Sequence, residues 1–215
     1  MDKLITIAIA DDHLMMRHAL AGLLNVLGGM QVVIEASDGK ELIDLINNEK
    51  IKPDICIVDI NMKGMNGFDT VIELKKRWPD IGILVLTQYS SEHYIIRMIT
   101  YGANGYLFKG GHQDELKNAI YSIHINGYYY SEQVSGSFIH SIQSGKLSLP
   151  HITAKETELL KLCGSDLTYA EIAAKLNTTS RAVEGYRDSL FKKLGMTSRV
   201  SLALYAISSG IVLPD

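Results

Sequence analysis

Five polar residues whose side chains suit phosphoryl chemistry each come at or just after the end of an apolar run. Asp11 and Asp12 follow "IAIA", Asp59 follows "ICIV", Thr87 follows "ILVL" and Lys109 follows "GYLF". Two adjacent carboxylates repel each other and are costly to take out of water, so this placement indicates a nearby cation. If the three acids converge, Mg²⁺ is the natural partner, because it is a hard ion that takes oxygen ligands.

The remaining two side chains complete a set that fits a phosphoryl group. Lys109 would bring a point charge to the same pocket, and Thr87 a hydroxyl donor. The metal and the ammonium would neutralise oxygens of the transferred group while one Asp acts as nucleophile, which yields an aspartyl phosphate.

The elements that must position these residues are short, nearly continuous apolar runs, typical of parallel strands covered on both faces. The expected strands are residues 4–10, 31–36, 55–58, 81–86 and 105–108. Such sheets place their sites beyond the carboxyl ends of the strands, which is where the five polar residues stand.

Helical patterns alternate with the strands. The first helix carries an apolar stripe expected to face the core: Met16, Leu20, Leu23, Leu24 and Leu27. Further helices are expected near residues 39–48, 67–77, 91–99 and 114–126. Five such units in a row predict an α/β fold, a doubly wound five-stranded parallel sheet with right-handed crossovers.

A different pattern follows a stretch rich in Ser and Gly at residues 131–150, which has the composition of a linker. Beyond it we expect four helices and no strand. Thr153 with Glu156 and Thr168 with Glu171 form capping boxes at the first two helices. The second and third helices, joined by a tight turn, predict a helix-turn-helix. The third carries the basic residues Arg181, Arg187, Lys192 and Lys193.

Composition limits the function classes. The 215 residues carry a net charge of -3, with residues 1–130 at -4 and residues 151–215 at +1, a modest asymmetry that suggests two parts with different partners. No apolar run approaches the roughly 20 residues of a membrane span, and a secretory signal pattern is lacking. Cys56 and Cys163 match no metal spacing, and we expect a cytoplasmic protein without membrane association.

The segments "IADDHLMMR", "DICIVDINMKGMNGFD", "ILVLTQYS" and "GYLFKG" resemble, in order, the receiver domain of two-component response regulators, which has a flavodoxin-like fold. The resemblance implies that Asp59 is the phosphoacceptor. It also implies that Asp12, Asp59 and the backbone carbonyl of Asn61 ligate Mg²⁺ directly, and that Asp11 acts through water. Thr87 and Lys109 would bind phosphoryl oxygens, and Tyr106 would be the aromatic switch.

The segments "LTYAEIAAKL", "AVEGYRDSLFKKLG" and "LALYAISSGI" resemble the LuxR-type DNA-binding domain of NarL/FixJ-type regulators. The resemblance implies binding to double-stranded DNA, at an inverted repeat, by a homodimer paired through the last helix. The DNA contacts expected on the third helix and its cap are Thr179, Ser180, Arg181, Glu184, Arg187, Asp188, Lys192 and Lys193. The expected dimer contacts are Leu202, Tyr205 and Ser209.

Together these features predict a receiver domain at residues 1–128, a linker at 129–147 and a DNA-binding domain at 148–215. A sensor histidine kinase would phosphorylate Asp59 with Mg²⁺, and the receiver would control dimerisation and DNA binding. We expect no enzymatic activity beyond the receiver's own phosphorylation and dephosphorylation. The alternatives are a receiver that only dimerises and is never phosphorylated, a metal-dependent phosphatase, and a helical domain that binds protein instead of DNA. A phosphatase of this kind needs a general acid two residues after its nucleophile, where Asn61 stands.

Overall fold

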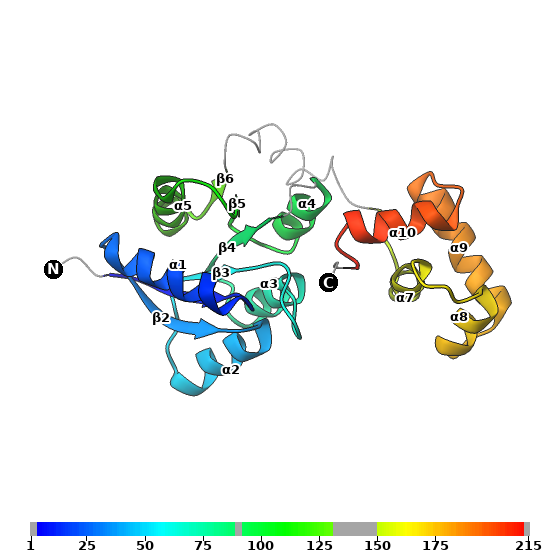
Figure 1. The fold of residues 1–215 in the computed structure, drawn as a ribbon, viewed down its shortest axis with the longest axis horizontal. Coiled ribbons are helices and arrows are strands. Elements are labelled where there is room, and N and C mark those ends of the chain that lie inside the picture. Colours follow the sequence, from blue (N-terminus) through cyan, green and yellow to red (C-terminus); the bar gives the residue numbers. More distant parts are fainter. Residues whose placement is uncertain (1–3, 89–91, 131–149, 213–215) are drawn as a thin grey trace. The chain divides into compact units, whose positions relative to one another are not determined.

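The computed structural model describes residues 4–88, 92–130 and 150–212, with the backbone alone at residues 92 and 93 (Figure 1). The chain divides into two compact units, Met1–Ser90 with Ile95–Leu147, and Ser91–Tyr94 with Ser148–Asp215. Residues 131–147 of the expected linker lie outside the described residues. None of the described helices is long and apolar enough to cross a membrane.

The first unit is built on a parallel sheet with the strand order β2-β1-β3-β4-β5-β6. Its strands are β1 (Ile5–Ala10), β2 (Met30–Ala36), β3 (Ile55–Val58), β4 (Gly82–Thr87), β5 (Gly105–Phe108) and β6 (Tyr129–Tyr130). Since β1 lies beside both β2 and β3, the strand order reverses there, and the crevice above β1 and β3 is the expected place for a ligand.

Five helices accompany these strands (Figure 1): α1 (Leu14–Val26), α2 (Gly39–Glu49), α3 (Gly67–Arg77), α4 (Glu92–Thr100) and α5 (Gln113–Asn126). One hydrophobic cluster joins α1 and α5 to one face of the sheet and includes Leu24, Ile120, Ile7 and Ile57. The helix α2 contacts α3, β1 and β2, and α3 contacts β3. The predicted doubly wound parallel sheet is therefore confirmed.

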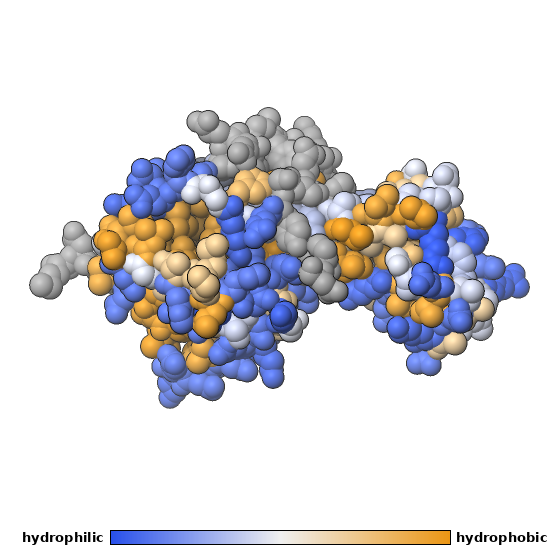
Figure 2. Space-filling view, viewed as in Figure 1, coloured by the Kyte–Doolittle hydropathy of each residue, from blue (hydrophilic) through white to orange (hydrophobic). Residues whose placement is uncertain are grey.

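Two details of this unit differ from the sequence expectations. The sheet has a sixth strand, β6, whose two residues pair with Gly105 and Tyr106 and begin the range expected to be linker. In α1, Leu20 and Leu24 are buried as predicted, but Met16 is 44% exposed. The helix exposes further large apolar side chains, among them Met15 and Val26, and Figure 2 shows apolar surface on the first unit.

The second unit contains four helices and no strand in the part described from residue 150 to 212. Its helices are α7 (Ala154–Cys163), α8 (Tyr169–Lys175), α9 (Ser180–Leu194) and α10 (Arg199–Ser208). Both predicted capping boxes are present, and the side chain of Thr179 caps α9 by accepting a hydrogen bond from the Ala182 N–H. A core around Leu159, Ile172 and Leu190 holds the four helices together.

The residues of the last helix that were expected at a dimer contact are buried in this chain. Leu202 is fully buried and Tyr205 is 7% exposed, both inside this unit's own core, and Ser209 is buried as well. Leu202 and Tyr205 therefore contribute to the core of their own unit in this chain, and their role in pairing stays a prediction. The large apolar side chains that α10 exposes are Val200, Leu204 and Ile207, in a region where Figure 2 shows apolar surface.

Candidate functional site

Three aspartates of the first unit, Asp11, Asp12 and Asp59, meet at the carboxyl ends of β1 and β3. The Asp11 N–H donates to Ala36 O at 3.1 Å, and the Asp59 N–H donates to Ala10 O at 2.9 Å, so the ladder continues through both aspartates. Their side chains are 3% and 6% exposed, in a setting where an unpaired carboxylate is costly. The sheet itself therefore holds two like charges close together.

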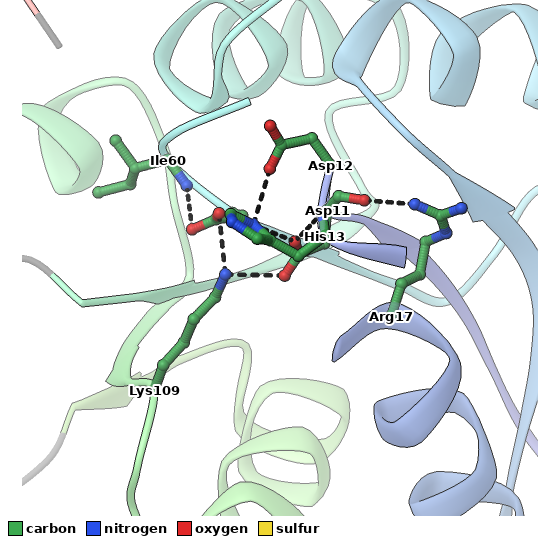
Figure 3. A network of polar contacts seen from close by, with 7 residues as sticks. Asp11, Asp12, His13, Arg17, Ile60 and Lys109 are labelled. Carbon is green, nitrogen blue, oxygen red and sulfur yellow. Dashed lines mark hydrogen bonds and ion pairs between the residues drawn. The ribbon is translucent and has the colours of Figure 1, made fainter. Parts of the chain in front are cut away.

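The ammonium of Lys109, from the end of β5, bridges these two carboxylates (Figure 3). Its Nζ lies 2.7 Å from Asp11 Oδ2 and 2.8 Å from Asp59 Oδ2. Burial raises the pKa of Asp59 above its usual value; Lys109 opposes this rise and the charge of Asp11 adds to it. Burial alone would lower the pKa of Lys109, but the two acids more than offset it, so the pKa is raised and the side chain is held as a cation.

A third carboxylate leaves the site with more negative charge than Lys109 neutralises. Ligand atoms of Asp11, Asp12, His13 and Asp59 all lie within 4.8 Å of one another. Asp12 Oδ1 is buried and accepts no hydrogen bond from any described residue, although His13 Nδ1 lies 2.9 Å away. A buried oxygen that accepts no hydrogen bond, beside an imidazole nitrogen and two more carboxylates, is what a hard divalent cation fits. The side chains present therefore suit Mg²⁺.

The other residues expected at this site are on β4, on β5 and in the loop after β3. Thr87 ends β4 and is fully buried, and its carbonyl accepts a hydrogen bond from the Lys109 N–H at 2.6 Å. Tyr106, on the neighbouring strand β5, is 1% exposed, with its ring edge-on to Phe108 at 5.6 Å between centroids. Asn61 lies two residues beyond Asp59 and is partly exposed.

Gly67 was not identified as a site residue from the sequence, although it begins α3 next to the acidic cluster. Its N–H donates to Ile60 O at 2.9 Å. A Cβ at this position would lie 2.3 Å from Asp59 O and 2.7 Å from Ile60 Cα, distances that backbone atoms cannot tolerate. Only glycine lets α3 approach the strand end that carries Asp59.

The second unit presents its expected DNA-binding residues in two different environments. Ser180, Arg181, Glu184, Asp188 and Lys192 are exposed. Arg187 is instead 28% exposed, pairs with Asp188 at 2.8 Å and has its guanidinium carbon 5.4 Å from the centre of the Tyr169 ring. The hydroxyl of Thr179 is used by the helix cap.

Lys193 is also engaged within the domain. Its Nζ lies 2.8 Å and 2.7 Å from the two carboxylate oxygens of Glu156, which is 3% exposed. The same carboxylate accepts hydrogen bonds from the Thr153 N–H and the Ser189 hydroxyl, both at 2.7 Å. Burial would raise the pKa of Glu156, but these contacts lower it to about 2.

Arg199 is a further residue that was missed from the sequence. At the start of α10, its guanidinium donates to the carbonyls of Cys163 at 2.9 Å, Leu167 at 2.6 Å, Ser165 at 2.7 Å and Leu162 at 3.3 Å. These carbonyls belong to the end of α7 and to the loop before α8, so one side chain fixes the loop that sets the angle between the helices. No spacing in the sequence links Arg199 to these carbonyls; in the structure its guanidinium carbon also lies 5.3 Å from the centre of the Tyr169 ring.

Comparisons with known proteins agree with this arrangement. Residues 7–121 match the family described as response regulator receiver domain, and residues 150–206 match the bacterial regulatory proteins of the luxR family. The nitrate/nitrite response regulator NarP of Escherichia coli is 32% identical over 92% of both chains. The response regulator GacA of Pseudomonas aeruginosa is 29% identical over 97% of this chain and 98% of its own.

Among solved structures, the RcsB response regulator of Salmonella typhimurium, described for its conformational dynamism in DNA interaction, is similar to this chain. The two are 25% identical, with a TM-score of 0.56, over 94% of this chain and 97% of that one. The similarity to all three proteins spans both units and not the acidic site alone.

Proposed function

Since the chain belongs to the response regulators of the NarL/FixJ type, which join a receiver to a LuxR-type DNA-binding domain, we propose that phosphorylation of Asp59 controls its binding to DNA. The observation that carries the proposal is the bridge from Lys109 to Asp59 and Asp11, next to the unsatisfied Asp12 oxygen. This is the charge arrangement that a phosphoryl group needs in order to be received and held.

In the proposed reaction, an Asp59 carboxylate oxygen attacks the phosphorus of a phosphohistidine on a sensor histidine kinase. The P–N bond breaks as the new P–O bond forms, and the leaving imidazole takes up a proton. Asp12, Asp59, the carbonyl of Asn61 and, less directly, Asp11 would hold Mg²⁺, which would supply charge neutralisation for the phosphoryl oxygens. Lys109 exchanges part of its contact with Asp59 for a phosphoryl oxygen, and the Thr87 hydroxyl donates to another.

The conformational response is a shift between two populations. Movement of Thr87 toward the phosphoryl group opens space on its side of β4, and Tyr106 on β5 occupies that space. Its ring is 1% exposed here, so the inward position is compatible with the packing of this chain. Phosphorylation would increase the share of molecules in that arrangement, because the phosphoryl group contacts Thr87 and Lys109 more favourably there than in the other arrangement.

The output in this proposal is DNA binding by a homodimer at an inverted repeat. The helix α9 would enter the major groove, with early residues such as Ser180 and Arg181 near base edges. Pairing would use the exposed face of α10, where Val200, Leu204 and Ile207 recur at helical spacing on one side.

The test is to incubate the full chain with acetyl phosphate and Mg²⁺, then measure intact mass and affinity for genomic DNA fragments. We expect the addition of one phosphoryl group, its absence in Asp59→Asn, and tighter DNA binding by the modified chain. A chain that binds DNA but takes up no phosphoryl group would contradict the proposal and support a receiver that serves only for dimerisation. Continuous release of phosphate from small phosphate esters would instead indicate a phosphatase.

A further inference from the structure

Two adjacent lysines at the end of α9 differ in their surroundings. Both are exposed, but Lys192 forms no ion pair with any described residue, whereas Lys193 does. Lys193 places its ammonium on both oxygens of Glu156, at 2.7 Å and 2.8 Å. In the sequence the two are equivalent candidates for contact with a DNA phosphate, but in the folded domain one is available and the other is engaged.

The helical geometry of α9 separates the two lysines in the same way. Val183 and Leu190 are its fully buried residues. Arg181 and Lys192 are eleven residues apart, which is close to three turns, so they project from one side of the helix, opposite the buried residues. Lys193 is rotated by about 100° from Lys192, toward the side that packs on α7.

Glu156 cannot easily release its partner. It is 3% exposed and fully engaged, because it accepts bonds from Thr153, Ser189 and Lys193. Among the described residues, Lys193 is the only cation that forms an ion pair with the Glu156 carboxylate. Turning Lys193 out toward a phosphate would leave a buried carboxylate without a counter-charge, which costs more than a solvent-exposed contact with phosphate returns.

We propose that Lys192 carries a phosphate contact of α9, whereas Lys193 is a positioning residue that acts through Glu156. The Lys193–Glu156 pair joins the C-terminal end of α9 to the first turn of α7 and so fixes the rotation of α9 about its axis. The inference rests on the DNA-binding function proposed above. It distributes the basic residues of α9 between contact with DNA and support of the helix.

The experiment compares the full chain with its Lys192→Gln and Lys193→Gln variants, which differ by one position in an otherwise identical charge change. Binding to mixed-sequence duplex DNA is measured over a range of salt concentrations, and thermal unfolding is followed in parallel. Each phosphate contact contributes about 0.9 to the slope of log K against log salt. We expect Lys192→Gln to reduce the slope by about that amount and to leave unfolding unchanged.

For Lys193→Gln we expect an unchanged slope, a severalfold loss of affinity at every salt concentration and a lower unfolding temperature of the DNA-binding domain. Glu156→Gln, which keeps Lys193, should reproduce this behaviour. The losses of the two variants should not add in the double variant, and Lys193→Arg should restore both affinity and stability. Lys192→Gln and Glu156→Gln should be additive.

A slope reduced by about one unit in Lys193→Gln, with normal unfolding, would overturn the proposal. If Lys193→Gln does not fold, Glu156→Gln decides: unchanged affinity in that variant would also overturn it. Failure of the wild-type chain to bind duplex DNA at low salt would contradict the DNA-binding function itself and is therefore distinguishable from both results.

Discussion

Lys109 Nζ lies 2.8 Å from Asp59 Oδ2, and this contact joins the end of β5 to the end of β3 across the intervening strand β4. The same ammonium lies 2.7 Å from Asp11 Oδ2. One buried cation therefore balances two buried carboxylates, and a third carboxylate, Asp12, is left with an oxygen that accepts no hydrogen bond from the described residues. The stability of the receiver should therefore depend on the cations that balance these carboxylate charges.

Removal of the bridging ammonium should destabilise the receiver. In Lys109→Met, Asp11 and Asp59 would remain buried without their counter-charge, and we expect a loss of about 3 kcal/mol in the free energy of unfolding. Urea unfolding of the full chain, followed by Trp78 fluorescence, measures this loss. The matched control is Lys52→Met, whose pair with Asp80 is solvent-exposed and should contribute less than about 1 kcal/mol. Equal losses in the two variants would contradict the account.

Mg²⁺ should stabilise the receiver, because it binds the folded cluster and not the unfolded chain. At about 100 times its dissociation constant, one bound ion adds roughly 2.7 kcal/mol. We expect the ion to raise the unfolding temperature of the wild-type chain and of the surface control Asp80→Asn, but to have little effect on Asp12→Asn. An equal response of all three chains to the ion would show that the stabilisation arises elsewhere.

Gly67→Ala should displace α3 or the strand end that carries Asp59, although Gly67 is not itself part of the acidic cluster. The new Cβ would lie 2.3 Å from Asp59 O, so α3 must move away from the strand end or the strand end must shift. We expect lower thermal stability and weaker Mg²⁺ binding, measured by calorimetry. Gly22→Ala is the control, because a Cβ there meets nothing within 4 Å and should stabilise α1 by roughly 0.5 to 1 kcal/mol. Normal Mg²⁺ binding by Gly67→Ala would contradict the close approach.

The DNA-binding domain should lose stability in acid through Glu156. Hydrogen bonds lower the pKa of Glu156 from about 4.5 to about 2, so the unfolded chain binds this proton more tightly than the folded one. The resulting stabilisation, on the order of 3 kcal/mol at most, is present above about pH 4.5 and is lost as pH falls toward 2. The difference in unfolding temperature between the wild-type chain and Glu156→Gln should therefore shrink between pH 5 and about pH 3. A constant difference would show that the carboxylate charge is not responsible.

Arg199→Lys should destabilise the same domain despite the conserved charge. The planar guanidinium reaches four carbonyls, whereas an ammonium on a shorter stem reaches fewer of them. We expect a loss of about 3 kcal/mol in the free energy of unfolding. Arg181→Lys, on the exposed face of α9, should unfold like the wild-type chain. If Arg199→Lys were as stable as the wild-type chain, the planar guanidinium would not be needed to hold these carbonyls.

Much of the receiver and of its site could be predicted because the sequence pattern shows where buried strands end. A buried strand must be apolar, so a polar residue after it stands out, and parallel strands bring such residues to one edge. This placed Asp11, Asp59 and Lys109 together correctly. The short strand β6 could not be foreseen in the same way: it has two residues, and Asn104 helps to hold it in place, with its carbonyl accepting from the Tyr129 N–H.

Contacts between helices were harder to foresee than contacts within one. The capping box of Thr153 and Glu156 is a local pattern and was confirmed. The pairing of Glu156 with Lys193 depends on how α7 and α9 cross, which no spacing in the sequence reveals. The burial of Leu202 and Tyr205 likewise depends on which face of α10 turns inward, and an apolar helix with two apolar faces leaves that choice open.

The most direct test of the central claim is to locate the phosphoryl group by peptide mass spectrometry after brief treatment of the full chain with acetyl phosphate and Mg²⁺. The account predicts one modified peptide, with the group on Asp59, and no modification when Mg²⁺ is chelated or when Lys109 is replaced by Met. Modification at another residue, or equal modification of Asp59 without the divalent ion, would contradict it.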